Sequence, residues 1–167
     1  MIPVLISFIK LLMTFPVIVS GGSMLPTFYE GDVVYMSGYE AAFGGVERGD
    51  VVLFELEDSS DNVDVYIKRV VGMPGEKISI KDGVVSVDGR IASEPYLRWG
   101  TKTEVNVEDS SVFTSEMDGV VYNVPLGKYF VLGDNRQSSV DSRHFILHYV
   151  DVDDIKGVFT YLNFPYN

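Results

Sequence analysis

Short runs rich in Val, Ile, Tyr and Phe alternate along most of the chain with polar, glycine-containing turns. Such a pattern is typical of antiparallel β-structure, because each short run forms one strand and each turn reverses the chain. Asp82-Gly83 and Asp88-Gly89 lie beside alternating apolar positions and predict tight turns. We therefore expect a mainly β fold with antiparallel sheets. The clearest predicted strands cover residues 32–36, 50–55, 65–71, 77–80, 84–87 and 129–132.

Residues 1–19 are strongly apolar, with Lys10 as their only charge. A helix needs about 20 residues to cross a bilayer core, and Pro16 predicts that any helix ends near Thr14 or Phe15. The segment could be a short membrane anchor, the remainder of a longer one, or a cleavable signal peptide; the lack of a basic start disfavours the last. We expect a membrane-associated segment whose last residues form a strand, followed by a β-rich domain over residues 20–167.

Two polar regions interrupt the strand pattern. The acidic stretch 57–64 predicts a solvated hairpin tip, and it lacks the glycine and spacing of a calcium loop. Residues 99–123 have weaker periodicity and many Thr, Ser, Glu and Asp residues, so we expect an inserted loop or a small subdomain there. A short helical turn is predicted around residues 39–43.

Composition excludes several classes of function. The formal net charge of -11 disfavours binding to the nucleic-acid backbone. The absence of cysteine excludes disulfides, thiolate catalysis and cysteine-ligated zinc. The only histidines are His144 and His148, too few for a histidine-rich metal site. We predict no metal and no cofactor.

Ser23 has the surroundings that a nucleophile needs. Gly21 and Gly22 precede it, so the backbone before the serine can adopt unusual angles. Pro26 follows and restricts the backbone after it. Such a turn exposes the hydroxyl and holds it in place. Taken alone, however, a serine beside glycine is more often part of an ordinary turn.

Lys68 is the second residue with chemical potential. Lys68 and Arg69 are adjacent in a predicted strand and so point to opposite faces, one of which must be the more buried. Burial lowers the pKa of a lysine from about 10.4, and at about 7–8 the amine accepts a proton near neutral pH. A surface lysine is the simpler interpretation of this residue alone.

The segment Gly133–Arg143, GDNRQSSVDSR, supplies a third group. Ser139, Asp141 and Arg143 alternate and share one face of an extended chain. A hydroxyl can orient a neutral lysine, and an Asp–Arg pair can hold the geometry. The alternative is a polar loop with one surface salt bridge.

Together these segments resemble the type I signal peptidase family. Its serine motif is similar to SMLPT at Ser23–Thr27, and a following strand motif is similar to RGDVVLF at Arg48–Phe54. The lysine motif resembles YIKRVVGMPGE at Tyr66–Glu76, and the last motif resembles Gly133–Arg143. All four occur in the family's order behind an apolar segment. They are specific as a set, although residues 89–125 match nothing in it.

The resemblance implies an endopeptidase that removes signal peptides from exported preproteins after small residues at positions -1 and -3. Ser23 would attack the scissile carbonyl, and Lys68 would act as general base. The oxyanion hole would use the Ser23 N–H, with a backbone group at Gly21 or the Ser20 hydroxyl as second donor. Supporting residues would be Ser139, which orients Lys68, together with Asp141, Arg143 and Arg69.

The resemblance also implies an extended substrate bound beside a strand edge and an apolar surface that contacts lipid. It places the enzyme at a bacterial plasma membrane, with its catalytic domain on the extracytoplasmic side. Candidates for contact with substrate or membrane are Met24, Leu25 and Phe28, with Tyr96, Leu97 and Trp99 as further ones.

Three alternatives remain at this stage. A soluble, self-cleaving repressor-type peptidase shares the serine–lysine pair but would lack the last motif and the apolar segment. A non-catalytic β-domain on a membrane anchor leaves the co-occurrence of the motifs unexplained. A histidine triad would require His144 or His148 to face Ser23.

Overall fold

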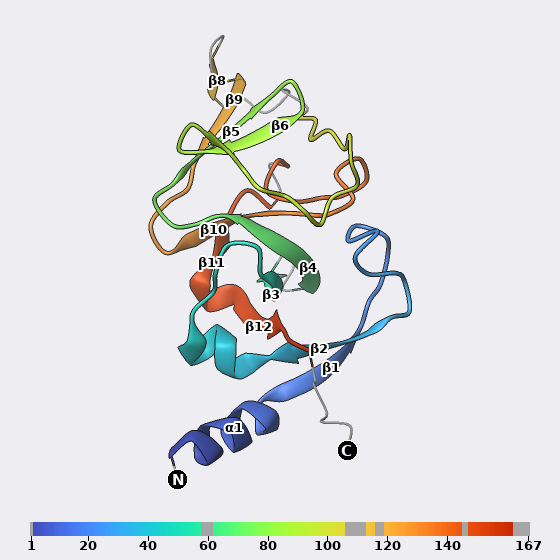
Figure 1. Ribbon diagram of the computed structural model, residues 1–167, viewed down its shortest axis with the longest axis vertical. Coiled ribbons are helices and arrows are strands. Elements are labelled where there is room, and N and C mark those ends of the chain that lie inside the picture. Colours follow the sequence, from blue (N-terminus) through green and yellow to red (C-terminus); the bar gives the residue numbers. More distant parts are fainter. Residues whose placement is uncertain (1, 58–61, 106–112, 116–118, 145–146, 162–167) are drawn as a thin grey trace.

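The computed structural model describes residues 2–57, 62–105, 113–115, 119–144 and 147–161. Two antiparallel β-sheets form the body of the protein (Figure 1), which confirms the predicted fold class. The larger sheet has seven strands, in the order β1 (Thr14–Ile18), β2 (Val33–Ser37), β12 (Ile155–Phe159), β3 (Val51–Glu57), β4 (Val63–Gly72), β10 (Lys128–Leu132) and β11 (Val150–Asp151). The smaller sheet has five, in the order β7 (Arg90–Ile91), β6 (Val84–Val87), β5 (Lys77–Lys81), β9 (Gly119–Asn123) and β8 (Phe113–Ser115).

All six predicted strands are present, as β2, β3, β4, β5, β6 and β10. The predicted tight turns are present as well. Asp82 and Gly83 have φ of 54° and 84°, and Asp88 and Gly89 have 48° and 77°. Two successive positive φ angles match the twist of a two-residue hairpin, which is why the Asp-Gly pair marks these sites.

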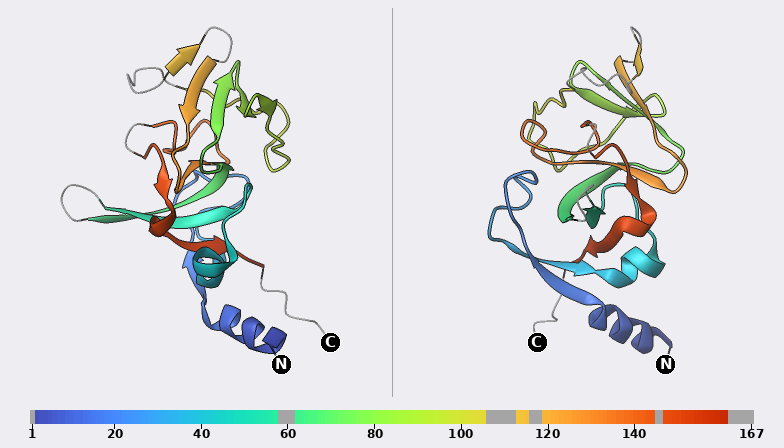
Figure 2. Two further views of the ribbon diagram at one scale, coloured as in Figure 1. Left: turned by 90° about the vertical axis from the view of Figure 1, so that its left-hand side faces the viewer. Right: turned by 180° about the vertical axis from the view of Figure 1, so that it is seen from behind.

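The predicted insertion at 99–123 ends in two strands of the smaller sheet. β9 pairs with β5 on one side and with β8 on the other. Val120 and Tyr122 of β9 are buried against the smaller sheet's core. The predicted helical turn near 39–43 is the short π-helix η1 (Glu40–Gly44), and a 3₁₀ turn, η2 (Val152–Asp154), precedes β12. Residues 58–61 of the acidic stretch 57–64 lie outside the described residues. The strands on either side of them, β3 and β4, pair with each other and extend from the body (Figure 2).

The N-terminal segment forms a helix and an edge strand. Helix α1 (Ile2–Leu12) projects from one end of the protein (Figure 1), and β1 follows it. Pro16 lies inside β1, where it is tolerated because β1 is the outermost strand of its sheet. Among the described residues, no helix has the length and apolar character needed to span a bilayer. Lys10 pairs with Glu40 of η1 at 2.5 Å, which ties the helix to the domain.

Candidate active site

Residues 22–28 form a compact turn that carries Ser23. The backbone N–H of Leu25 donates to Gly22 O at 3.2 Å, and the N–H groups of Thr27 and Phe28 both donate to Met24 O. This local winding turns Met24 and Phe28 inward, where they are 2% and 7% exposed and pack with Val19 and Met36. The prediction that Phe28 contacts substrate or membrane is therefore wrong, and Met24 is likewise closed to lipid. Leu25 stays half-exposed.

Lys68 reaches this turn from the middle of the larger sheet. Its Nζ lies 2.7 Å from Ser23 Oγ and donates to the Ile67 carbonyl at 3.1 Å. The residue is 4% exposed, and burial lowers the pKa of Lys68 to about 8, against a smaller opposing effect of the Asp141 charge. Half of the amine is therefore neutral at a mildly alkaline pH.

Arg69, the neighbour of Lys68, is also buried, so both faces of β4 are covered rather than one. Its guanidinium donates two hydrogen bonds to Asp134, at 2.8 and 2.6 Å, and one to the Gly49 carbonyl at 2.7 Å. The Tyr96 ring lies 4.0 Å from the guanidinium carbon. A buried guanidinium needs such bidentate pairing to compensate for lost hydration. Arg69 thus joins Asp134, and not the Asp141–Arg143 pair.

The loop after β10 forms hydrogen bonds with the serine turn. Asn135 donates its backbone N–H to Ser23 O at 3.0 Å and its side-chain amide to Gly22 O at 2.9 Å. The Thr27 hydroxyl donates to Asp134. Neither Asp134 nor Asn135 was predicted to support the site, although the polar pair that follows Gly133 in GDNR was the available signal. These contacts fix Ser23 relative to β4.

Asp141 and Arg143 form the predicted ion pair. Arg143 donates to both carboxylate oxygens of Asp141, at 2.8 and 2.7 Å, and Asp141 also accepts from the N–H of Gly133 at 3.0 Å. Ser139 behaves differently from the prediction. Its Oγ is buried without a hydrogen-bond partner among the described residues, so the expected bond to Lys68 is not formed. A Cβ added to Gly133 would lie 2.2 Å from this Oγ and 2.5 Å from Ser23 O, which places the hydroxyl beside the serine turn.

A groove of about 570 Å³ runs along the serine–lysine pair. We call it the site groove; one wall is residues 17–24 and the other is residues 65–68, with Ser138 and Val140 at the side. Both walls present unpaired backbone. β1 is the outer strand of its sheet, and β4 pairs with β10 only from Arg69 onward. An extended peptide can therefore hydrogen-bond to either wall.

The two histidines lie elsewhere. His144 lines a separate hollow with Glu104 and Arg143, whereas the side-chain partner of Ser23 Oγ is Lys68. The geometry offers Ser23 an amine and no imidazole.

Known proteins are similar to this chain over most of its length. The family model described as "Signal peptidase, peptidase S26" matches residues 1–162. Signal peptidase I T of Bacillus subtilis is 37% identical over 152 residues, which cover 91% of this chain and 75% of that protein. Signal peptidase IB of Staphylococcus aureus is 35% identical over 158 residues, covering 91% and 78%. A crystal structure of a signal peptidase I from Enterococcus faecalis is 32% identical, covers 70% of this chain and 97% of that one, and superposes with a TM-score of 0.49.

The chain therefore belongs to the signal peptidase family, peptidase S26. It is a serine endopeptidase that cleaves signal peptides from preproteins, as the sequence predicted. This assignment goes against both the repressor-type peptidase and the non-catalytic binding domain.

Proposed function

We propose that Ser23 is the nucleophile of this peptidase and Lys68 its general base. The observation that carries the proposal is the 2.7 Å separation of their reacting atoms at an amine that is 4% exposed. Neutral Lys68 takes the Ser23 proton as Oγ bonds to the scissile carbonyl carbon, and the protonated amine then gives that proton to the departing amine. In the second half Lys68 activates the water that releases the acyl group from Ser23.

The oxyanion that forms on the carbonyl needs donors already in place. The Ser23 N–H has no acceptor among the described residues, so it is available. Ser20 and Gly21 line the same groove and supply the second donor in this proposal. Asp134 and Arg69 act through position, because they hold β4 and the serine turn together. Asp141 and Arg143 act through position as well, because they brace the loop after β10 at Gly133 and Arg136.

Ser139 orients Lys68 in the working enzyme by a change of its side-chain rotamer. Support comes from its buried, unpartnered hydroxyl, since such a group costs free energy until it finds a partner. Ser139→Ala is expected to lower kcat and to shift the ascending limb of the pH–rate profile, with little change in KM. An unchanged pH profile would assign Ser139 to packing alone.

The signal peptide lies extended in the site groove, paired with the edges of residues 17–19 and 65–67. Main-chain pairing gives affinity without sequence preference, and the alternating side chains give specificity. Groove walls made of Val17, Ile67 and Met24 favour small residues at -1 and -3. This agrees with cleavage after an Ala-X-Ala sequence.

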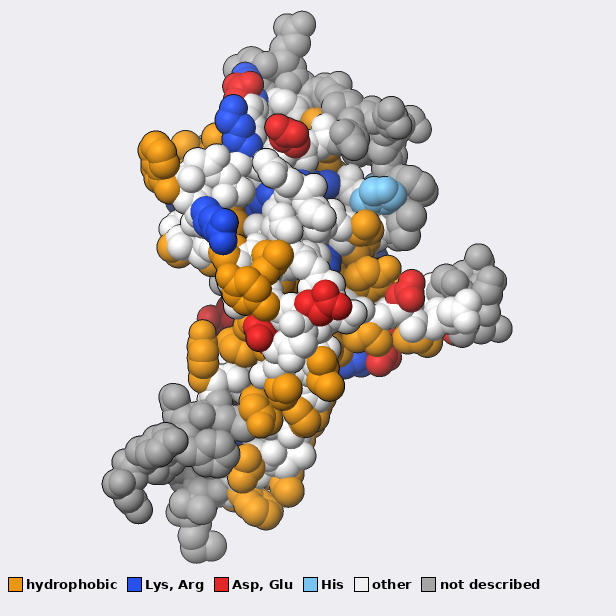
Figure 3. Space-filling model, turned by 90° about the vertical axis from the view of Figure 1, so that its right-hand side faces the viewer, with side chains coloured by type: hydrophobic (Ala, Val, Ile, Leu, Met, Phe, Trp, Pro, Cys, Tyr) orange, Lys and Arg blue, Asp and Glu red, His pale blue; other side chains and the backbone are white. Residues whose placement is uncertain are grey.

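Helix α1 and β1 contact the bilayer, on the extracytoplasmic side of a bacterial plasma membrane. Hydrophobic side chains gather over this end of the protein (Figure 3). Exposure of large apolar groups is 59% at Leu5, 57% at Phe8, 69% at Leu12 and 70% at Ile18. Such a surface favours lipid over water. Sedimentation with lipid vesicles checks this, and a Phe8→Ser, Leu12→Ser double variant that binds as well as the wild type would contradict it.

Cleavage of a preprotein with an Ala-X-Ala site by the detergent-solubilised protein tests the catalytic roles. Ser23→Ala and Lys68→Ala are each expected to lower the rate at least about a thousandfold, as for other residues that act as a catalytic unit. Ser93→Ala and Lys156→Ala change the same residue types at exposed positions and serve as controls. Near-normal cleavage by either site variant would refute the proposal.

A further inference from the structure

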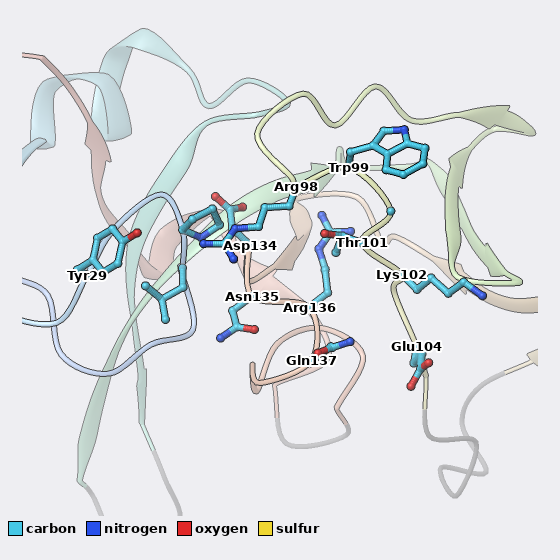
Figure 4. A pocket seen from close by; sticks show the side chains of 13 residues that line it. Tyr29, Arg98, Trp99, Thr101, Lys102, Glu104, Asp134, Asn135, Arg136 and Gln137 are labelled. Carbon is cyan, nitrogen blue, oxygen red and sulfur yellow. The ribbon is translucent and has the colours of Figure 1, made fainter.

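A second cavity, of about 580 Å³, opens on the other side of the serine turn (Figure 4). The site groove includes turn residues up to Met24, and this cavity begins at Leu25; the two share no lining residue. Asn135, which holds the carbonyls of Gly22 and Ser23, lines the second cavity. A peptide that leaves the site groove past Ser23 therefore meets this cavity next.

The cavity has an excess of positive charge in a protein whose net charge is -11. Of its charged residues, Asp134 is neutralised by Arg69, and Arg136 by Glu94. The charged lining residues that remain are two cations, Arg98 and Lys102, and one anion, Glu104. Neither Arg98 nor Lys102 forms an ion pair with any residue that the structure describes.

The side chains around the cavity differ in direction. In Figure 4 Arg98 extends across the cavity toward the side lined by Tyr29, whereas Lys102 and Glu104 lie at the opposite end. Thr101, Asn135 and Gln137 add polar groups along the wall. A single unpaired guanidinium that points into a hollow with hydroxyl and amide neighbours suits a carboxylate.

We propose that this cavity, the Arg98 pocket, takes the first residues of the mature chain and that Arg98 selects an acidic side chain there. The inference rests on the proposed function, which places the residues before the cut in the site groove and leaves those after it on this side. The occupant is thus the part of the preprotein that the enzyme releases as its new N-terminus.

An anionic lipid headgroup is the competing source of negative charge. Trp99 is fully exposed and points away from the cavity in Figure 4, so its indole suits a membrane surface. Arg98 is also exposed, but its side chain extends across the cavity toward Tyr29, and the cavity is lined by Leu25 and Asn135 beside the serine turn. The direction of the two neighbouring side chains therefore favours a peptide for Arg98.

The test compares preproteins that share one signal peptide and one Ala-X-Ala site and differ by a single Asp, Asn or Lys placed at successive positions of the early mature segment. At the position that meets Arg98, we expect kcat/KM for Asp to exceed that for Asn by about two- to fivefold, chiefly through KM, with Lys below Asn. The preference should shrink at high salt, because solvent-accessible charges are screened. Arg98→Glu should invert it, so that Lys is preferred over Asp.

Arg90→Glu makes the same charge change at an exposed position on β7 and should keep the wild-type preference. Equal rates for Asp and Lys at every position, or an unaltered preference in Arg98→Glu, would overturn the inference. The inference would also fail if Arg98→Glu kept the wild-type preference for Asp but bound anionic vesicles more weakly, because Arg98 would then contact lipid. Thermal unfolding confirms that both variants fold. The catalytic proposal is tested separately by Ser23→Ala. If that variant loses cleavage while Arg98→Glu keeps the wild-type preference, the catalytic proposal stands and only the inference about Arg98 fails.

Discussion

The two sheets of this peptidase use their interiors differently. The larger sheet buries charged residues around one point, where Lys68 and Arg69 of β4 meet Asp134 and Asp141 of the loop after β10. The described core of the smaller sheet contains no charged side chain and is built from residues such as Ile78 and Ile80 of β5, Val85 of β6 and Val120 of β9. Burial of charge costs free energy and burial of apolar surface provides it. The smaller sheet therefore contributes mainly to stability, whereas the larger sheet buries charged groups at the site although their burial is unfavourable.

The largest effect is expected where a charge loses its partner. Asp134→Ala leaves Arg69 buried and unpaired, and such a change costs about 3–5 kcal/mol. It also removes the acceptor of Thr27, so the serine turn loosens. We expect a large drop in the free energy of unfolding, measured by urea denaturation, together with at least about a tenfold loss of kcat, equivalent to about 1.4 kcal/mol of transition-state stabilisation.

Ile80→Ala provides the matched comparison in the smaller sheet. It removes a fully packed side chain and is expected to cost about 2–5 kcal/mol of stability. Below its unfolding temperature, however, kcat should stay close to the wild-type value, because Ile80 belongs to the core of the smaller sheet, whose described members include neither Ser23 nor Lys68. Equal losses of kcat in the two variants would show that the sheets do not divide structure from chemistry.

Lys68→Met is expected to have an intermediate effect on stability, and to raise the free energy of unfolding rather than lower it. The pKa of Lys68 is about 10.5 in the unfolded chain and about 8 in the folded protein. The charged amine therefore opposes folding, and this cost is fully present below about pH 8. The variant should therefore be inactive yet more stable at pH 7, by up to about 3 kcal/mol. This gain should vanish as pH rises from about 8 to 10.5. Denaturation midpoints across that range check the sign.

The same pKa predicts the pH dependence of the wild-type enzyme. kcat/KM should rise with pH through about 8 as Lys68 loses its proton, and then level off. An ascending limb near the usual histidine value that disappears in His144→Ala would instead favour an imidazole base.

The smallest effect is expected at the outer edge of the smaller sheet. Ile91 of β7 is 77% exposed and belongs to none of the three hydrophobic core clusters formed by the described residues. Ile91→Thr should change stability by less than about 0.5 kcal/mol and leave cleavage unaltered. A clear loss of activity would mean that this edge takes part in substrate binding.

The local predictions succeeded where one short segment decides the structure. The strands β3, β4 and β6 follow from short runs rich in apolar residues between turns. The turns at Asp82-Gly83 and Asp88-Gly89 follow from the tolerance of Asp and Gly for positive φ. Predictions that depended on a distant partner were less complete. Arg69 was expected among the supporting residues, but its partner Asp134 was not predicted, because that contact joins segments far apart in the sequence.

Phe28 and Ser139 illustrate the same limit. The winding of residues 24–28 decides that Phe28 packs against Phe159, with ring centroids 4.9 Å apart, and no pattern in the sequence specified that contact. The Ser139 hydroxyl was expected to bond to Lys68, yet it is buried beside Gly133 without a partner in the described part of the chain.

By itself, the sequence determined the mainly β architecture, the family, and the two residues with reactive groups, because alternation and motif spacing are local properties of the chain. Only the tertiary structure decided that Lys68 lies 2.7 Å from Ser23 and away from water, and that Arg98 lines a second cavity on the other side of the serine turn. These facts depend on how strands distant in sequence pack together. Packing sets the desolvation of each charge, and desolvation in turn sets its pKa.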